Sequence, residues 1–362
     1  MKELVLYRKY RPQTFSEVSG QDHVVKTLLS ALKSGKVAHA YLFAGPRGVG
    51  KTTTARLLAK AVNCLDSSSL EPCNKCDSCL EIMENRAMDL IEIDAASNRG
   101  IEEIRELRER IRFTPIKGKY KVFVIDEAHQ LTKEAFNALL KTLEEPPAHA
   151  IFILATTEVH KMLPTIISRV QRFDFKKFGL NDILDRLELI SKKEKVKADK
   201  KALRIIALNA EGHMRDAESM LGKVMAFSGD KEISVEDVEN ILGIVDINLA
   251  IKFIDLLADK DSKKALEFID KFINQGYDLV QFIQSLINYS RKLLLIKISK
   301  DLSKLIKEEL SSEQLNTAIK QADKFSIEEL SKIIEIFIET LFKMKRSSFP
   351  QLEVELAVVE IC

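Results

Sequence analysis

The chain has 362 residues, of which 46% are hydrophobic and 30% charged, the balance of a soluble globular protein with two or three domains. Its net charge of +2 excludes a general attraction to polyanions, so any nucleic-acid surface has to be a local patch. Residues 1–15 lack the apolar segment of a secretion signal and no apolar run could span a membrane, so we expect a cytoplasmic protein with no membrane partner.

The first 39 residues read as a lead-in that contains one helix. Three basic residues, Arg8, Lys9 and Arg11, stand before Pro12. Residues 22–33 carry apolar side chains at helical spacing, which predicts a helix with one buried face.

Five short apolar runs then alternate with helical patterns. They cover residues 41–44, 90–93, 122–125, 151–155 and, as a fifth candidate, 170–175. This alternation predicts an α/β fold with a five-stranded parallel sheet covered by helices.

The stretch after the first predicted strand has the P-loop pattern G-x-x-x-x-G-K-T and leads into a run of good helix formers. A strand–loop–helix connection aims backbone N–H groups and the positive end of a helix dipole at one point, which suits phosphate. We expect Lys51 to reach the β- and γ-phosphates of ATP and Thr52 to ligate Mg²⁺. The alternative is a glycine turn that binds nothing. The expected phosphate-binding residues are Gly45, Pro46, Arg47, Gly48, Val49, Gly50, Lys51, Thr52 and Thr53.

Four of the five cysteines follow this predicted helix at close spacing, as Cys64, Cys73, Cys76 and Cys79. Four thiolates so close together can surround one structural Zn²⁺ tetrahedrally, which leaves no open position for catalysis. Disulfides are less plausible in a reducing cytosol, and metal-free thiols are the other alternative. Because we expect the P-loop to draw nothing from this insert, a Cys76→Ser variant should lose zinc and still bind Mg-ATP.

Two later predicted strands end in polar residues at the edge where the P-loop should lie. Asp126 can hold the Mg²⁺ shell, and Glu127 can orient and deprotonate the water that attacks the γ-phosphate. Thr157 can hydrogen-bond that water or the phosphate. The alternatives are an exposed acidic strand end and a threonine that caps a strand for structural reasons.

Two arginines stand in suggestive positions. Arg169 follows Ser168 after a stretch, residues 163–167, that predicts a helical turn at the rim of the domain. Arg215 lies in a run that opens a helix in a later, helical part of the chain. For either arginine alone, a solvated or salt-bridged surface role is the default.

These residues together make the chain similar to the gamma/tau subunits of the bacterial DNA polymerase III clamp loader, which are AAA+ ATPases. Besides the P-loop, the stretches 8–15, 91–97 and 136–147 carry the resemblance. The cysteine insert is its most discriminating feature, because most AAA+ proteins lack one. The similarity is dense over residues 1–225 and only architectural beyond them.

The resemblance implies three domains, since strand patterns end near residue 176 and helical patterns continue. They are a nucleotide-binding domain at residues 1–177 with a zinc module at about 64–79, a helical lid at 178–242, and a helical collar for oligomerisation at 243–362.

The resemblance also implies roles for single residues. Thr157 becomes the sensor 1 residue, and Arg215 becomes the sensor 2 arginine that reaches from the lid to the nucleotide. Tyr7, Arg11 and Val18 would surround the adenine.

Arg169 stands in a motif that the family writes Ser-Arg-Cys and that reads Ser168-Arg169-Val170 here. The resemblance implies that this arginine acts in trans, on ATP bound by a neighbouring subunit. The lost cysteine does no chemistry, so the role should survive.

The implied partners are delta and delta-prime type subunits, further copies of this chain, a sliding clamp and primer–template DNA. ATP binding would open the clamp and admit DNA, and hydrolysis would release the clamp closed on the duplex. We expect polymerase and helicase contacts to need a tail that is absent here.

A loader that acts at any primer has to follow the phosphate backbone. Helix N-termini and lone cations suit phosphates, although ordinary caps and surface charge remain the alternative. The nominated DNA contacts are Ser97, Asn98, Arg99, Thr132, Lys133 and Lys141.

Two other functions compete with this interpretation. One is a branch-migration type DNA motor on the same core, which would need pore or hairpin elements and usually a winged-helix domain, and the sequence after residue 242 predicts neither. The other is a scaffold subunit with a silent ATPase, and the intact Lys51, Thr52, Asp126 and Glu127 argue against it.

Overall fold

The computed structural model describes residues 5–66, 69–229, 231–243, 246–299, 310 and 312–362. The chain divides into two compact units, Met1–Met225 and Ala226–Cys362. The three domains expected from the sequence have other boundaries, at residues 177 and 242, which this division does not test. Among the described residues, no helix combines the length and the apolar character needed to cross a bilayer.

The first unit is built on a five-stranded parallel sheet, which confirms the predicted fold class. The strands lie in the order β2-β3-β4-β1-β5, and every pairing between neighbours is parallel. Each strand lies within about one residue of a predicted apolar run. The strands are β1 (Ala40–Ala44), β2 (Leu90–Asp94), β3 (Lys121–Asp126), β4 (Ala150–Thr156) and β5 (Gln171–Asp174).

The three central strands, β1, β3 and β4, are buried almost throughout. Successive side chains of a strand point to opposite faces, so a continuous apolar run fills a core on each side. Phe123 and Phe152 stack in one core, with ring centroids 5.3 Å apart. Phe43 and Phe173 meet edge to face in the other, at 5.9 Å.

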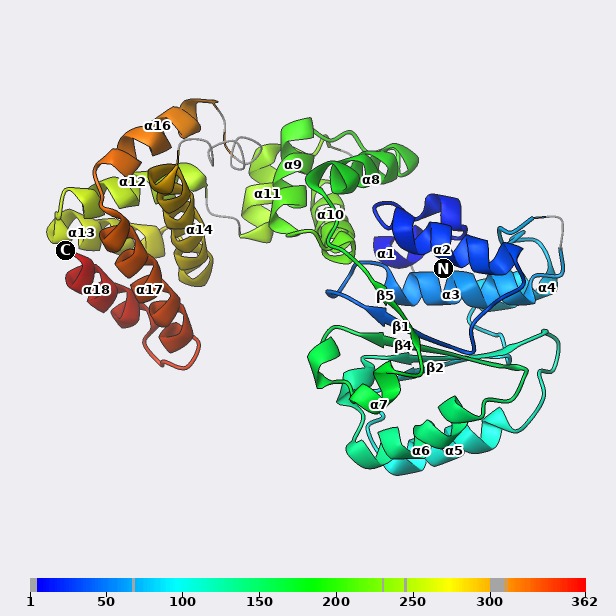
Figure 1. Ribbon diagram of the computed structural model, residues 1–362. Coiled ribbons are helices and arrows are strands. Elements are labelled where there is room, and N and C mark those ends of the chain that lie inside the picture. Colours follow the sequence, from blue (N-terminus) through cyan, green and yellow to red (C-terminus); the bar gives the residue numbers. More distant parts are fainter. Residues whose placement is uncertain (1–4, 67–68, 230, 244–245, 300–309, 311) are drawn as a thin grey trace. The chain divides into compact units, whose positions relative to one another are not determined.

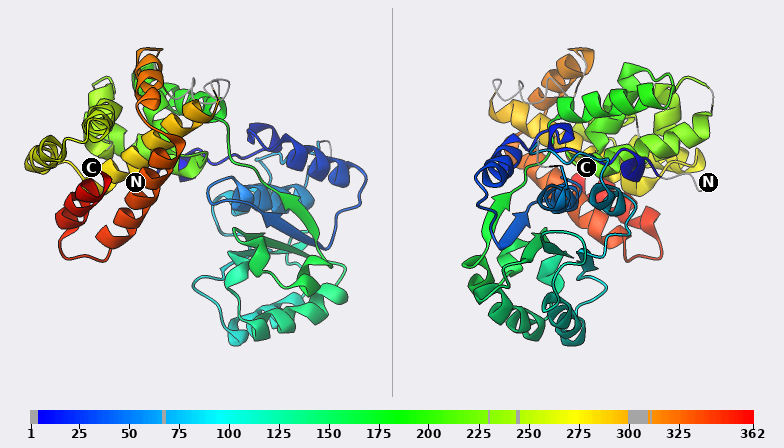
Figure 2. Two further views of the ribbon diagram at one scale, coloured as in Figure 1. Left: turned by 60° about the vertical axis from the view of Figure 1, so that its left-hand side comes forward. Right: turned by 90° about the vertical axis from the view of Figure 1, so that its right-hand side faces the viewer.

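Helices cover both faces of this sheet (Figures 1 and 2). One face packs against α2 (Asp22–Lys33) and α3 (Lys51–Asn63). The other packs against α5 (Ile101–Ile111), α6 (Lys133–Glu144) and the single turn α7 (Pro164–Ile167). The bounds of α2 are those predicted from its apolar spacing.

Shorter elements join these layers. The helix α4 (Asp77–Met83) begins within the cysteine insert, carries Cys79 and packs against α3. Residues 67–68 of the insert lie outside the described residues. The other short elements are α1 (Leu6–Lys9) and three 3₁₀ turns, Phe15–Glu17, Ala128–Gln130 and Val159–Lys161.

Three helices follow β5, in the region where the sequence predicts helices only. They are α8 (Leu180–Lys193), α9 (Lys200–Asn209) and α10 (Met214–Ser228). The turn before α10 depends on Gly212, whose φ is +86°, and a Cβ there would lie 2.8 Å from the Cβ of Lys177. A side chain at Gly212 would therefore be strained and crowded. Because the turn leads directly into α10, it determines where the first turn of that helix, which carries Arg215, is placed.

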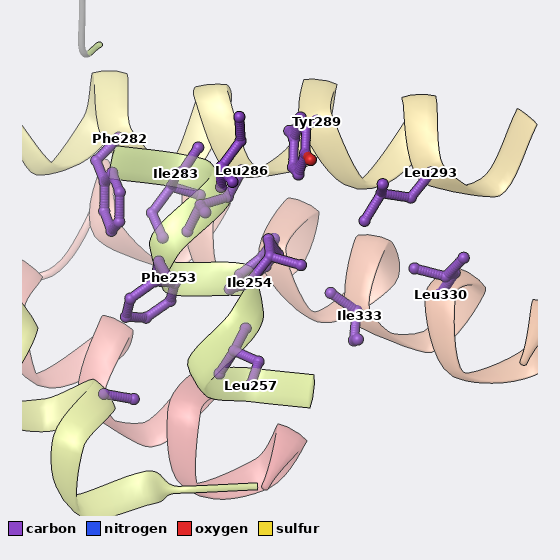
Figure 3. Close-up of a cluster of buried hydrophobic side chains, with 14 of the residues drawn as sticks. Phe253, Ile254, Leu257, Phe282, Ile283, Leu286, Tyr289, Leu293, Leu330 and Ile333 are labelled. Carbon is purple, nitrogen blue, oxygen red and sulfur yellow. The ribbon is translucent and has the colours of Figure 1, made fainter. Parts of the chain in front are cut away.

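The second unit is helical, as predicted, over its described residues. Its core forms mainly between α12, α14 and α17 (Figure 3). Phe253 and Phe282 meet edge to face there, with centroids 5.2 Å apart. Residues 244–245, 300–309 and 311 of the predicted collar lie outside the described residues. The helices are α11 (Val235–Leu242), α12 (Ile247–Ala258), α13 (Ser262–Asn274), α14 (Leu279–Ile298), α16 (Ser312–Asp323), α17 (Ile327–Met344) and α18 (Pro350–Ile361).

Candidate functional site

The parallel sheet gathers the candidate residues at one edge, because the carboxyl ends of parallel strands lie side by side. The P-loop follows β1, Asp126 ends β3 and Thr156 ends β4, and β4 lies between the other two strands. The backbone N–H of Gly45 donates to the carbonyl of Thr156 at 3.1 Å, which fixes the loop beside that strand end.

The loop between β1 and α3 turns tightly through three glycines. Gly45, Gly48 and Gly50 have φ angles of +147°, +73° and +98°. A Cβ on Gly45 would lie 2.5 Å from the carbonyl oxygen of Phe175, so a larger residue cannot replace it without a backbone shift. Since α3 begins directly after Gly50, its free N–H groups and its dipole face the loop, as an anion requires.

Lys51 lies almost buried within this loop. Its ammonium group donates to the carbonyls of Gly45 at 2.8 Å and Pro46 at 2.7 Å. Burial lowers the pKa of Lys51, and the nearby carboxylates of Glu127 and Asp126 act in the opposite direction. The ammonium group of Lys51 is thus held against the loop, close to the carboxylates of Glu127 and Asp126.

Thr52 and Asp126 connect the loop to the end of β3. The Thr52 hydroxyl donates to Oδ2 of Asp126 at 2.8 Å. Hydroxyl and carboxylate oxygens are the hard ligands that Mg²⁺ prefers, so the two side chains fit one Mg²⁺ beside bound phosphates.

Glu127 has an unusual backbone conformation for a residue other than glycine, with φ +47° and ψ +43°. Thr157 donates from its hydroxyl to Oε2 of Glu127 at 2.9 Å. The sequence suggested that Thr157 faces the water or the phosphate, and that role stays a prediction. In this structure the hydroxyl fixes the carboxylate instead.

His129 is a neighbour of Glu127 that sequence reasoning set aside. Its ring is almost buried, and Nδ1 lies 3.0 Å from Oγ1 of Thr156 and 3.5 Å from Oε2 of Glu127. Nε2 lies 3.1 Å from a carboxylate oxygen of Glu158. Its position two residues after the acidic pair was the only signal in the sequence.

A cavity of about 350 Å³ opens against the P-loop. Tyr7, Arg11, Val18 and Arg215, all named from the sequence, line it, whereas Thr157 and Arg169 do not. The Arg215 guanidinium lies 4.6 Å from the centre of the Tyr7 ring and lowers the pKa of that phenol by hydrogen bonding and by its charge. The lining residues are Tyr7, Arg8, Arg11, Pro12, Glu17, Val18, Ser19, Arg47, Gly48, Val49, Gly50, Lys51, Thr52, Thr53, Asp94, Asp126, Glu127, Phe178, Arg186, Met214, Arg215 and Glu218.

One side of the cavity is lined by an ion pair that no sequence motif predicts. Arg186 of α8 donates from Nε to Oε1 of Glu218 in α10 at 2.9 Å, and its Nη2 donates to the carbonyl of Tyr10. Burial raises the pKa of Glu218, while the charges of Arg186 and Arg11 oppose that shift. The pair joins three segments that are far apart in the sequence, which is why a local pattern could not reveal it.

Arg169 is not among the residues that line the cavity beside the P-loop of its own chain. Its guanidinium donates to the carbonyl of Thr165 at 2.8 Å and pairs with Glu144, at the end of α6, at 2.7 Å. The side chain keeps about a third of its surface exposed. Its trans role stays a prediction.

The four cysteines of the insert come together as one cluster. The Sγ atoms of Cys64, Cys73, Cys76 and Cys79 all lie within 4.8 Å of one another. A tetrahedral Zn²⁺ with bonds of about 2.3 Å separates its sulfur ligands by about 3.8 Å, so the cluster fits zinc closely. Backbone N–H groups of Lys75 and Cys76 donate to Sγ of Cys73 and lower its pKa to about 6, whereas burial raises the pKa of Cys64 and of Cys79.

The nominated DNA residues form two groups that the fold brings together. Residues 97–99 precede α5, and Thr132 caps α6 by accepting from the N–H of Ala135 at 3.2 Å. The N–H of Thr132 donates to the carbonyl of Arg99 at 3.2 Å. Arg99, Lys133 and Lys141 are exposed. The cap explains Thr132 without DNA, so the DNA contacts stay a prediction.

Comparison with known families divides the chain into three matched regions. Residues 20–179 match the family described as "DNA polymerase III, delta subunit". Residues 182–230 match "DNA polymerase III clamp loader subunit, ATPase lid domain". Residues 233–362 match "DNA polymerase III subunits gamma and tau domain III".

Similar proteins match the chain over most of its length. The tau subunit of DNA polymerase III from Bacillus subtilis is 44% identical over all 362 residues, and that of Escherichia coli is 40% identical over 83% of the chain. The chain spans 64% of the first relative and 46% of the second. Among solved structures, a RuvB variant of Thermotoga maritima has the same fold, with a TM-score of 0.50 and 20% identity over 68% of this chain and 78% of that one.

Proposed function

The chain belongs to the gamma/tau subunit family of the bacterial DNA polymerase III clamp loader, and from this membership we propose that it is an AAA+ ATPase subunit of such a loader. The observation that carries the proposal is the contact between Thr52 and Asp126, at 2.8 Å, with Glu127 directly beside it. These are the groups that nucleotide hydrolysis needs, on one edge of the sheet.

In the proposed reaction the P-loop amides and Lys51 bind the β- and γ-phosphates of ATP. Thr52 and Asp126 would hold Mg²⁺, which when bound neutralises charge on these phosphates. Glu127 accepts the proton of the attacking water, and the Thr157 hydroxyl keeps its carboxylate in place. Tyr7, Arg11 and Val18 form the part of the cavity wall that surrounds the adenine, and Arg215 approaches the nucleotide from the lid.

We further propose the partners that the family implies. The chain assembles with delta and delta-prime type subunits and with copies of itself, and the collar, residues 243–362, makes most of that assembly. ATP binding opens the sliding clamp and admits primer–template DNA, and hydrolysis releases the closed clamp. Contacts with the polymerase and the helicase require the parts of the relatives that lie outside the matched region. The protein acts in the cytoplasm.

DNA contacts are proposed at the adjoining starts of α5 and α6. Ser97, Asn98 and Arg99 precede one helix, and Thr132 and Lys133 open the other, with Lys141 further along it. Exposed cations beside helix N-termini suit phosphate oxygens and carry no base preference.

Reconstitution tests this function. The chain is mixed with delta and delta-prime type subunits, a sliding clamp and primed DNA, and ATP hydrolysis is measured as components are left out. We expect hydrolysis to rise strongly only with the full set, and to be lost with Lys51→Ala. Unwinding of DNA without a clamp would favour a DNA motor instead, and no hydrolysis under any condition would indicate a scaffold.

A further inference from the structure

The cysteine insert touches a segment that lines the nucleotide cavity. Glu71, between Cys64 and Cys73, accepts hydrogen bonds from the backbone N–H groups of Phe15 at 2.7 Å and Ser16 at 3.0 Å. Hydrogen bonds to a charged carboxylate stabilise more than hydrogen bonds between neutral groups do. The segment at residues 13–16 is thus fastened to the insert.

Lys60 makes a second link, from α3. It is only 2% exposed, and its ammonium donates to the backbone carbonyl of Gln13 at 3.1 Å and to the side-chain oxygen of Gln13 at 3.0 Å. It also donates to the side-chain oxygen of Asn74, which directly follows Cys73. A buried cation whose acceptors come from two loops joins them strongly, because losing either loop leaves the buried charge with fewer acceptors.

The fastened segment continues into the cavity wall on both sides. Arg11 and Pro12 precede it and Glu17 and Val18 follow it, and all four line the cavity. Gln13 holds these neighbours in place. Its side-chain amide donates to the carbonyl of Arg11 at 2.9 Å, and its backbone N–H donates to the carboxylate of Glu17 at 2.6 Å. The phosphate end of the cavity depends instead on the P-loop.

We propose that Glu71 and Lys60 are positioning residues, through which the cysteine module holds the wall of the nucleotide cavity at residues 11–18. The inference rests on the proposed function, since it assumes that this cavity takes a nucleoside phosphate and that the cluster takes a metal. A short polar insert has little core of its own and is ordered when its thiolates bind a metal. Metal occupancy therefore sets how well Glu71 and Asn74 are held, and so how well the wall is formed.

Coupling of this kind is reciprocal. If the metal strengthens nucleotide binding, then bound nucleotide has to strengthen metal retention by the same factor. The expectation from sequence, that loss of zinc leaves Mg-ATP binding intact, then holds for the P-loop contacts and fails for those of the wall.

The first test measures binding of a fluorescent ADP analogue to the full chain, without hydrolysis. Cys76→Ser and Glu71→Ala should each weaken binding by about five- to tenfold, at the lower end of typical couplings between sites. Combining the two should weaken binding little further than Cys76→Ser alone, because loss of the metal already loosens the Glu71 contact. Glu71→Gln keeps one acceptor and should recover part of the affinity. Glu84→Ala, an exposed carboxylate near the module whose partner is Arg86, should have no effect.

The second test needs no substitution in the module. The zinc affinity of the wild-type chain, measured at equilibrium by competition with a chromogenic chelator, should rise about five- to tenfold in saturating ADP, and Lys60→Met should reduce that difference. Equal zinc affinities with and without ADP, or Cys76→Ser and Glu71→Ala binding like wild type, overturn the proposal. Failure of the proposed function looks different, since wild type would then not bind the analogue, or Lys51→Ala would bind it equally well.

Discussion

At the scale of single residues, the most informative surroundings are those of Glu127. Two groups outside the cavity lining lie against its carboxylate: the hydroxyl of Thr157, which donates a hydrogen bond at 2.9 Å, and the ring of His129, whose Nδ1 is 3.5 Å away. A general base works only if its oxygen points at the attacking water, and small displacements of catalytic groups are costly.

His129→Ala should therefore lower kcat while leaving KM for ATP unchanged. We expect a fall of about ten- to a hundredfold in the assembled loader, the range that misplacing a catalytic group by a fraction of an ångström to one ångström produces. Steady-state ATPase assays measure both constants. His160→Ala is the matched control, because His160 also lies near Glu158 but is largely exposed. A raised KM with an unchanged kcat would show that His129 serves nucleotide binding instead.

Asp89 is a residue whose effect is on stability alone. Its carboxylate accepts from the N–H groups of Ile116, Lys117 and Gly118 at 2.8–2.9 Å, and so shapes the loop before β3. Burial raises the pKa of Asp89, but the three backbone hydrogen bonds outweigh burial and the net shift is downward. A lowered pKa in the folded state contributes stability that is fully present above the ordinary carboxyl pKa and is lost as the pH falls through the lowered pKa of the folded state.

Asp89→Asn should reduce the free energy of unfolding of this unit by about 1–3 kcal/mol at pH 7, because backbone donors lose a charged acceptor. The difference from wild type should shrink as the pH falls from about 4, the ordinary carboxyl pKa, through the lowered pKa of the folded state, where the wild-type carboxyl becomes protonated. Urea unfolding at several pH values measures it. Asp174→Asn, at an exposed carboxylate, serves as the control, and a pH-independent difference would contradict the account.

At the scale of elements, strands and site motifs differ in how far the sequence predicts them. Strands β1, β3 and β4 were predictable because both faces of each strand are buried, so each strand appears in the sequence as a continuous apolar run. The P-loop and the Asp126-Glu127 pair were predictable because each is a local pattern at a strand end. The contact of Glu71 with residues 15–16 and the Arg186–Glu218 pair were not, because each joins distant segments and any polar surface residue could make it.

The cysteine cluster gives a prediction at this scale. Because the four Sγ atoms lie within 4.8 Å of one another, elemental analysis of freshly purified, reduced protein should find about one zinc per chain. Cys76→Ser should lose the metal, whereas Cys362→Ser, outside the cluster, should keep it. Protein that carries no metal, although its thiols are reduced and intact, would end this assignment.

At the scale of the whole molecule, the trans role of Arg169 is testable only in an assembly. The isolated Arg169→Ala chain should bind ATP normally, because the residue lies outside the cavity lining of its own chain. In the assembled loader hydrolysis should fall by about 10³-fold or more at the adjacent site, as when an arginine supplied in trans is removed.

Arg172→Ala is the control for Arg169→Ala, because Arg172 is a nearby arginine that pairs with Asp174. Mixtures of Arg169→Ala with Lys51→Ala chains add a second criterion. Interfaces that pair an intact pocket with an intact arginine should keep their activity, so mixed assemblies should show partial rates. Loss of ATP binding by the isolated Arg169→Ala chain would mean that the arginine serves its own pocket.

The central claim is that the cavity beside the P-loop hydrolyses ATP with Glu127 as the base. The most direct measurement is single-turnover hydrolysis by a reconstituted loader that carries Glu127→Gln, together with nucleotide binding by the same protein. We predict that binding stays near the wild-type value while the hydrolysis rate falls by about 10²–10⁴-fold, the contribution of a general base. Hydrolysis at the wild-type rate by a loader in which every copy carries Glu127→Gln would contradict the account.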